Sequence, residues 1–352
     1  MTRRPWIGET EPEITRRRAC AAAGALAILA AGCGAERSDP AAREPDPRLP
    51  PPAETADSPE LTRPPSGQVV AVGAVAEGVV ADPRTGLVAV GFRDPFRLAL
   101  VDGANGEVRR EVPMPGSLRH LQLQAPGGPV LVAAESSNEL LLVALPSGEV
   151  SSRVGVGKFP HDATATAGGS IVVANEFGGT VSVVEGGRVV HTFGNAAQPG
   201  GVASVGERVG MVDVRKNSLT VYDIAGRQTL AELPAGEGTT HVVAGPQGRL
   251  LVADTEGDAI GVFGLDPEPR MLGRLPLPGS PYGISYDDVR DRLWVTLTAT
   301  NEVVGIDFAA AQPRVAIRLP TIRQPNTVAV NSTTGRIYVA SPALGALELI
   351  DP

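Results

Sequence analysis

Polar and ionisable residues recur at one position of a repeated segment, at a spacing of about 40 to 43 residues. The residues at this position are Glu77, Arg119, His161, Gly200, His241, Tyr282 and Asn326. Three of the four histidines, His120, His161 and His241, fall at this position or beside it. A carboxylate, a guanidinium, imidazoles, a phenol and an amide that meet at one place would bind a polar ligand, and an imidazole there could also transfer protons.

A second repeated position, near the end of the following apolar segment, reads Gly91, Ala134, Asn175, Asp213, Asp254, Leu297 and Ser341. Oxygen atoms suit divalent metals. The candidate metal ligands are therefore the oxygens of Asn175, Asp213 and Asp254 at this position and of Asp162, which follows His161. His161 and His241 are further candidate donors. The alternative is turn chemistry, because Asn and Asp tolerate left-handed backbone, and in that case the chain holds no cofactor.

Seven similar units position these residues, and each unit predicts four β-strands. The second strand is apolar, as in Leu250-Leu251-Val252-Ala253, and the fourth is weaker and more polar. Four strands at this period predict an all-β fold, a seven-bladed β-propeller over residues 67–352. In a propeller the innermost strands begin around a central channel, so we expect the first repeated position to form a ring there.

The last unit ends at Pro352 after only three strands. An unpaired apolar segment, Gln68-Val69-Val70-Ala71-Val72, precedes the first unit. We expect this segment to supply the missing outer strand, which would close the ring and remove an open sheet edge.

Blocks such as Arg249-Leu250-Leu251-Val252-Ala253-Asp254 and Gly335-Arg336-Ile337-Tyr338-Val339-Ala340-Ser341 resemble the YVTN-type β-propeller repeats of bacterial surface and periplasmic proteins. The resemblance covers about residues 67–352. It implies a propeller that acts as a binding scaffold.

The pair Pro160-His161 is also similar to the blade starts of the streptogramin B lyase propellers. That resemblance implies seven blades and a histidine that works with metal-bound carboxylates. This chain departs from it, because Asn175 and Asp254 stand where those enzymes carry Glu, and their aromatic strand motif is missing.

The beginning of the chain predicts export. A basic stretch, Arg16-Arg17-Arg18, precedes an apolar run from Ala19 to Ala31 that is too short to span a membrane. Ala30-Ala31-Gly32-Cys33 resembles the bacterial lipobox, in which the cysteine thiol receives a diacylglyceryl group. We therefore expect a signal peptide over residues 1–32 and lipidation of Cys33. The arginines resemble a twin-arginine signal, with general secretion as the alternative.

Residues 33–66 contain many prolines and few large apolar side chains. Such a chain buries too little surface to offset the entropy lost on ordering. We expect a disordered Pro-rich tether between the lipid anchor and the propeller.

Charge and composition limit the partners. The net charge is −8, and it becomes −10 without residues 1–32, which hold five Arg and three Glu. We therefore expect no nucleic acid partner, because the exported part has no excess of basic residues to bind phosphates. No nucleophile triad, phosphate-binding loop or cysteine pair is present in the propeller, so no residue is assigned a catalytic role.

These observations favour a lipid-anchored propeller at the cell membrane that faces away from the cytoplasm. We expect it to bind a protein, a peptide or a small molecule on its channel face. The alternative is a metal-dependent lyase or hydrolase in the same channel. An accessory subunit of a membrane-bound redox or transport complex is a third possibility.

Overall fold

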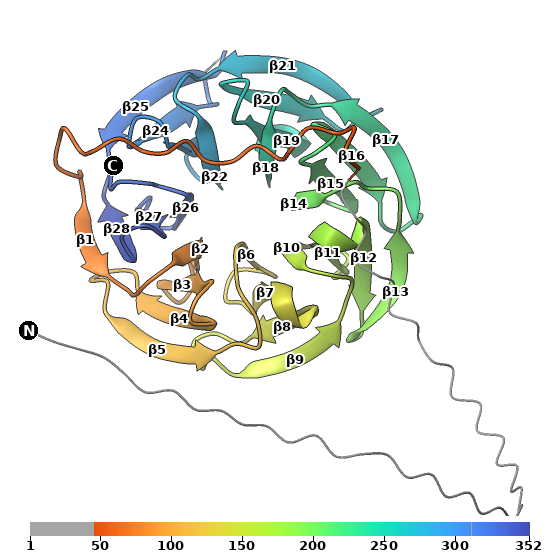
Figure 1. Ribbon diagram of the computed structural model, residues 1–352, viewed down its shortest axis with the longest axis horizontal. Helices are drawn as coiled ribbons and strands as arrows, with labels where there is room; N and C mark the ends of the chain where they lie inside the picture. Colours follow the sequence, from red (N-terminus) through yellow and green to blue (C-terminus); the bar gives the residue numbers. More distant parts are fainter. Residues whose placement is uncertain (1–45, 311) are drawn as a thin grey trace, which may run out of the picture. The chain divides into compact units, whose positions relative to one another are not determined.

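The computed structural model describes residues 46–310 and 312–352. In this part of the chain seven four-stranded antiparallel sheets stand radially around a central channel (Figure 1). The predicted seven-bladed all-β propeller is confirmed. The expected signal peptide, Arg16 to Arg18 and Cys33 lie outside these residues. None of the helices described is long and apolar enough to cross a membrane.

Each blade contributes one strand to each of four positions from the channel outward. The innermost strands are β2 (Ala76–Ala81), β6 (Leu121–Leu123), β10 (Pro160–Ala165), β14 (Pro199–Val205), β18 (Thr239–Ala244), β22 (Pro281–Asp287) and β26 (Thr327–Val330). The second strands are β3 (Leu87–Phe92), β7 (Val130–Ala134), β11 (Ile171–Asn175), β15 (Arg208–Asp213), β19 (Arg249–Asp254), β23 (Arg292–Leu297) and β27 (Ile337–Ser341).

The third strands are β4 (Arg97–Asp102), β8 (Glu139–Val143), β12 (Thr180–Glu185), β16 (Ser218–Asp223), β20 (Ala259–Gly264), β24 (Glu302–Asp307) and β28 (Ala346–Ile350). The outermost strands are β5 (Val108–Pro113), β9 (Val150–Gly155), β13 (Arg188–Phe193), β17 (Gln228–Pro234), β21 (Arg270–Pro276), β25 (Arg314–Pro320) and β1 (Gln68–Ala71). We number the blades 1 to 7 from β2, so that blade 7 contains β26, β27, β28 and β1. Short 3-10 helices η1 (Glu135–Ser137), η2 (Glu176–Gly178) and η3 (Pro246–Gly248) lie between strands.

Burial follows the position of each strand in its blade. The second strands β7 and β11 are buried along their whole length, because both faces of the sheet contact neighbouring blades. The outermost strand β21 is mostly exposed. The core is therefore divided into layers between adjacent sheets, such as the cluster that joins Trp294 of blade 6 to Val339 of blade 7. This explains why the second strand of each repeat is the most apolar.

The turns between second and third strands explain the polar residues of the repeat. The same turn position has left-handed backbone in six blades, where it is occupied by Asn138, Gly179, Asn217, Asp258, Asn301 and Gly345. Gly, Asn and Asp are the residues that adopt this conformation most readily. Turn geometry therefore accounts for the residue types seen there.

The ring is closed by the two ends of the propeller sequence, as predicted. Strand β1 pairs antiparallel with β28, with Gln68 opposite Leu349 and Ala71 opposite Ala346. The buried carboxylate of Glu348 accepts hydrogen bonds from the backbone N–H groups of Gly67 at 2.7 Å and Ile322 at 3.0 Å. The last blade is thus completed by the first strand of the chain.

The expected free tether needs correction over residues 46–66, which we call the strap. The strap has no helix or strand, but it lies on the propeller, where Figure 1 shows it crossing the blades from β16 to β25 before it enters β1. The side-chain amide of Gln324 contacts the strap at the N–H of Ser58, 3.1 Å away, and at the carbonyl of Ala56, 3.0 Å away. Arg215 donates to the carbonyls of Asp46 and Leu49 at 2.8 Å. These hydrogen bonds hold the strap on the propeller, although the strap buries few apolar side chains.

The closing strand can be tested with two adjacent valines. Val70 packs against the apolar cluster between blades 1 and 7, whereas Val69 is 45% exposed, since neighbouring residues of a strand face opposite ways. We expect Val70→Asp to lower the free energy of unfolding by about 1–3 kcal/mol, because it places a carboxylate against apolar side chains. Val69→Asn is the control, because an aspartate there would face the carboxylate of Glu348 on β28, and it should change this free energy by less than about 0.5 kcal/mol. Urea unfolding measures both, and equal small effects would show that β1 is not docked.

Candidate functional site

The ring residues lie at one end of the channel, which we call the mouth. In blade 3 the first residue of β10, Pro160, is opposite the last residue of β11, Asn175. In blade 6 Pro281 is opposite Leu297 in the same way. The starts of the inner strands and the turns after the second strands therefore share this end. The strap contacts the same end, because Ser58 donates to the carbonyl of Thr298, the residue after β23, at 2.6 Å.

A group of four charged side chains from blades 2 and 3 meets at the mouth. We call it the charged cluster, and it consists of Arg119, Glu135, His161 and Glu176. Nε of Arg119 lies 3.1 Å from Oε1 of Glu135. Nδ1 of His161 lies 3.4 Å from the same oxygen and 3.2 Å from Oε2 of Glu176. His161 and both glutamates are buried.

The two glutamates are held by the fold immediately after their strands. Glu135 begins η1 after β7, and Glu176 begins η2 after β11. Each carboxylate uses its other oxygen to accept a hydrogen bond, from the Ser117 hydroxyl at 2.7 Å and from the Gln198 amide at 2.8 Å respectively. Ser117 precedes blade 2 and Gln198 precedes blade 4. The position of the cluster therefore depends on the packing of adjacent blades.

Charge pairing controls the protonation of His161. Burial disfavours its charged form, but the carboxylates of Glu176 and Glu135 outweigh burial and raise the pKa of His161 to about 9. Burial likewise opposes ionisation of Glu176, yet His161 lowers the pKa of this carboxyl to about 2. The pair is therefore an imidazolium beside a carboxylate at neutral pH.

Glu77 of β2 lies beside the charged cluster but has a weaker ion pair. Its Oε2 is 3.4 Å from Nη1 of Arg93. Burial raises the pKa of Glu77 despite the charges of Arg93 and Arg119. The predicted ring thus brings Glu77, Arg119 and His161 to one side of the mouth.

A layer of aromatic rings continues from the charged cluster across the channel. The ring centroid of His120 lies 4.6 Å from that of His161 and 4.7 Å from that of His241, which in turn lies 4.5 Å from that of Tyr282. Burial and the charge of His161 lower the pKa of His241 to about 3 and hold that of His120 well below its usual value. This histidine layer of His120, His161, His241 and Tyr282 therefore contains one charged and two neutral imidazoles at neutral pH.

Of the two remaining ring residues, Gly200 lies in β14 and has no side chain, and Asn326 lies on the blade 7 side. It precedes β26, it is buried, and its Oδ1 accepts a hydrogen bond from the Gln324 amide at 3.3 Å. Gln324 also holds the strap. Asn326 is therefore linked to the strap rather than to the charged cluster.

The structure does not bring the four predicted metal ligands together. Asp213 accepts hydrogen bonds from the N–H groups of Lys216, in the turn after its strand, and Ala197, ahead of β14; Asp254 accepts those of Gly257 and Glu237 in the same way in the next blade. The Asn175 amide donates to Thr180 and Ser182 of its own blade, and Asp162 is held by Gln122 and the N–H of Val202. Local turn and strand contacts use these oxygens, so the expected metal set is corrected.

A different set in the described part of the chain has metal-site geometry. One ligand atom each of Glu135, His161 and Glu176 lies within 4.8 Å of the others. Two carboxylates and an imidazole suit a divalent cation, provided that His161 loses its proton. The nearby guanidinium of Arg119 opposes such a charge.

The sequence interpretation missed Glu135 and Glu176. Both stand one place after the second repeated position, as Ala134-Glu135 and Asn175-Glu176 in adjacent blades. Recurrence of Glu at that offset in two consecutive units was the available signal.

Comparison with known proteins relates the fold to others without identifying a family. No protein-family model and no curated protein sequence matches the chain. Among solved structures, a Kuenenia stuttgartiensis hydrazine synthase chain is 14% identical with a TM-score of 0.68 and covers 84% of this chain and 98% of its own. A streptogramin B lyase is 14% identical with a TM-score of 0.66, covering 82% of this chain and 95% of its own.

Virginiamycin B lyase from Staphylococcus aureus is 15% identical with a TM-score of 0.67 and covers 81% of this chain and 99% of its own. At this level of identity, similarity shows the architecture alone. The chain therefore shares the β-propeller fold with these proteins.

Proposed function

We propose that the protein is a lipid-anchored scaffold at the cell membrane, facing away from the cytoplasm, that binds a peptide or a small polar molecule at the mouth of its propeller. The charged cluster is the observation that carries this proposal. Arg119 Nε, Glu135 Oε1, His161 Nδ1 and Glu176 Oε2 are buried, and none makes a well-aligned hydrogen bond within the described residues. Buried charges are costly to keep and concentrate at functional sites.

The charges at the mouth favour a ligand that carries both signs. Arg119 and His161 supply positive charge, while Glu135 and Glu176 supply negative charge beside them. A peptide offers an ammonium and a carboxylate that could pair with these groups. The strap adds a further carboxylate, because Glu54 is close enough to Tyr282 to influence its pKa.

The anchor is proposed from the sequence. The lipobox-like segment before Cys33 supports lipidation, and the basic and apolar stretches ahead of it support export. A propeller tied to a membrane in this way would present its binding face outside the cytoplasm.

Binding at the mouth can be tested with a pool of random tetrapeptides that have free termini. Native mass spectrometry of the full chain should detect retained peptides at one per protein. We expect Arg119→Met and Glu176→Gln to weaken retention at least tenfold, because each removes a charge that would pair with one terminus of the peptide. Arg153→Met and Glu149→Gln, on exposed parts of blade 2, are the matched controls. Equal retention by all five proteins would refute the mouth as the site.

A metal-dependent lyase or hydrolase is the second candidate, and the spacing of Glu135, His161 and Glu176 favours it. Among the proteins of similar architecture are a streptogramin B lyase and a virginiamycin B lyase, the latter solved as a catalytically inactive variant with quinupristin. Here the three residues would hold the cation. The bound metal would supply Lewis acidity. With no metal bound, His161 would hold a proton at Nδ1 between the two carboxylates.

Manganese binding separates this candidate from the scaffold. If the group holds a cation, electron paramagnetic resonance should show one Mn²⁺ bound per chain, with affinity that rises from pH 6 to pH 9 because His161 must lose its proton first. Glu176→Gln should reduce the affinity at least tenfold, and Glu149→Gln should leave it unchanged. Absence of binding by the wild type at pH 9 would end the enzyme proposal.

A further inference from the structure

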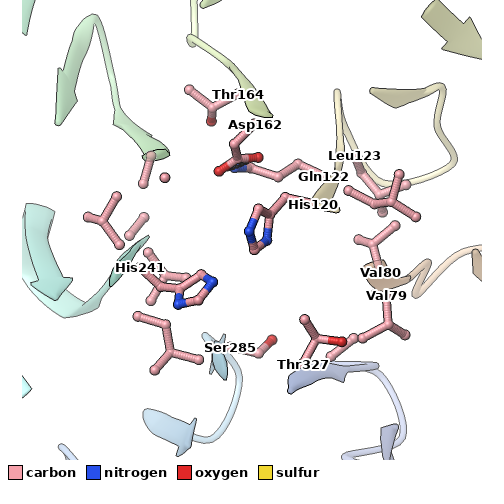
Figure 2. Close-up of a pocket in the computed structure, with 18 of the residues that line it drawn as sticks. Val79, Val80, His120, Gln122, Leu123, Asp162, Thr164, His241, Ser285 and Thr327 are labelled. Carbon is pink, nitrogen blue, oxygen red and sulfur yellow. Dashed lines mark hydrogen bonds between the residues drawn. The ribbon is translucent and has the colours of Figure 1, made fainter. Parts of the chain in front are cut away.

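A separate cavity occupies the channel beyond the histidine layer, at the end opposite the mouth. It has a volume of about 370 Å³ and is lined by the inner strands of all seven blades (Figure 2). His120 and His241 line it, whereas Glu77, Arg119, Glu135, His161 and Glu176 do not. We call it the inner chamber. Its volume lies at the lower end of the range of small-molecule sites, about 300–1,000 Å³.

The wall of the inner chamber carries both polar and apolar side chains. Figure 2 shows His120 and His241 reaching into it, with Asp162 and Gln122 side by side on the wall. The outer end is formed where the inner strands finish. There Val80, Leu123, Ala165, Ala244 and Val330 form an apolar part of the wall, which we call the collar, and Thr164, Ser204 and Ser285 lie at the same strand levels. A ligand that fits this wall has both polar and apolar parts.

The charges on the wall favour an uncharged ligand. No Lys or Arg lines the chamber, so an anion would be desolvated without a partner. The single carboxylate, Asp162, is already engaged. Its oxygens accept hydrogen bonds from Nε2 of Gln122 at 3.1 Å, from the N–H of Val202 at 3.0 Å and from the N–H of Ala163 at 2.8 Å. A cationic ligand would therefore displace contacts that tie three blades together.

One polar group on the wall is available to a ligand. Ser285, from blade 6, lines the chamber at the same strand level as Val80, and its hydroxyl makes no hydrogen bond to any described residue. His241 also lines the chamber, but its Nδ1 is enclosed by the protein and its ring contacts the backbone of Tyr282. A hydroxyl without a partner in the protein can donate to a ligand or accept from one.

We propose that the inner chamber is a binding site for an uncharged small molecule with both polar and apolar parts, whose polar group contacts Ser285 and whose apolar part contacts the collar. A carbonyl, hydroxyl or amide can pair with Ser285, because a hydroxyl can donate or accept. This site is independent of the one at the mouth, since the two share no member of the charged cluster.

Prodan, an uncharged naphthalene with a ketone, is a suitable probe because its emission shifts to the blue in apolar surroundings. We expect saturable binding of one prodan per full-length chain with blue-shifted emission. An analogue of prodan that carries a sulfonate should bind at least tenfold more weakly, since the wall offers no cation. No saturable prodan binding, or equal binding of the sulfonate, would overturn the proposal.

Two variants of collar residues test whether prodan binds in the inner chamber. Ala244 is the exposed last residue of β18, so Ala244→Trp should fill the chamber without disturbing the packing between blades. Ala165→Trp should also fill the chamber, from blade 3, where Ala165 is half-buried against the apolar cluster between blades 2 and 3. Each should weaken prodan binding at least tenfold, while Met271→Trp on the outer strand β21, where Met271 is 38% exposed, should not. Unchanged binding in the collar variants would place the dye elsewhere.

A measurement on the wild type covers the case in which the collar variants misfold. The methyl groups of Val80, Leu123 and Val330 should show the largest prodan-induced NMR shifts, because they form the collar. Valines of the outer strands, such as Val189 and Val315, should not shift. Shifts confined to outer strands would contradict the proposal.

Discussion

Closure of the ring is the constraint on which the site depends. Strand β1 completes the last of the seven sheets by pairing with β28 from the opposite end of the propeller sequence, and so covers the edge of β28 and ties the two ends of the ring together. Closure makes residues that are about 40 positions apart into neighbours. His161 can meet Glu135, and His120 can meet His241, only because their blades are held in a fixed order around the channel.

The residues that meet in the channel form two different environments. At the mouth, opposite charges are buried together, so that one imidazole stays protonated while both carboxylates stay ionised. Across the histidine layer, that same positive charge and burial keep His120 and His241 neutral. The charged cluster therefore lies at one end of the channel, and the two neutral histidines line the chamber at the other.

The fold could be predicted from the sequence because blade formation is local: each repeat carries its own apolar second strand and its own turn. Ring closure could be predicted from the number of strands in the last unit. The meeting of Glu77, Arg119 and His161 could be predicted because they share the first repeated position. Glu135 and Glu176 were missed because they stand in turns, where a glutamate signals nothing until the adjacent blade is placed. The strap was missed because its contacts are hydrogen bonds from Gln324 and Arg215, which leave no apolar pattern in the strap itself.

The titration of His161 tests the charged cluster most directly. Its folded-state pKa is raised from 6.5 to about 9, so its contribution to stability is present below pH 6.5 and is lost as pH rises through about 9. NMR of the imidazole carbons, assigned with His161→Gln, measures this value. The account predicts a midpoint near 9 for His161 that falls towards 6.5 in Glu176→Gln. A midpoint at or below 6.5 in the wild type would contradict it.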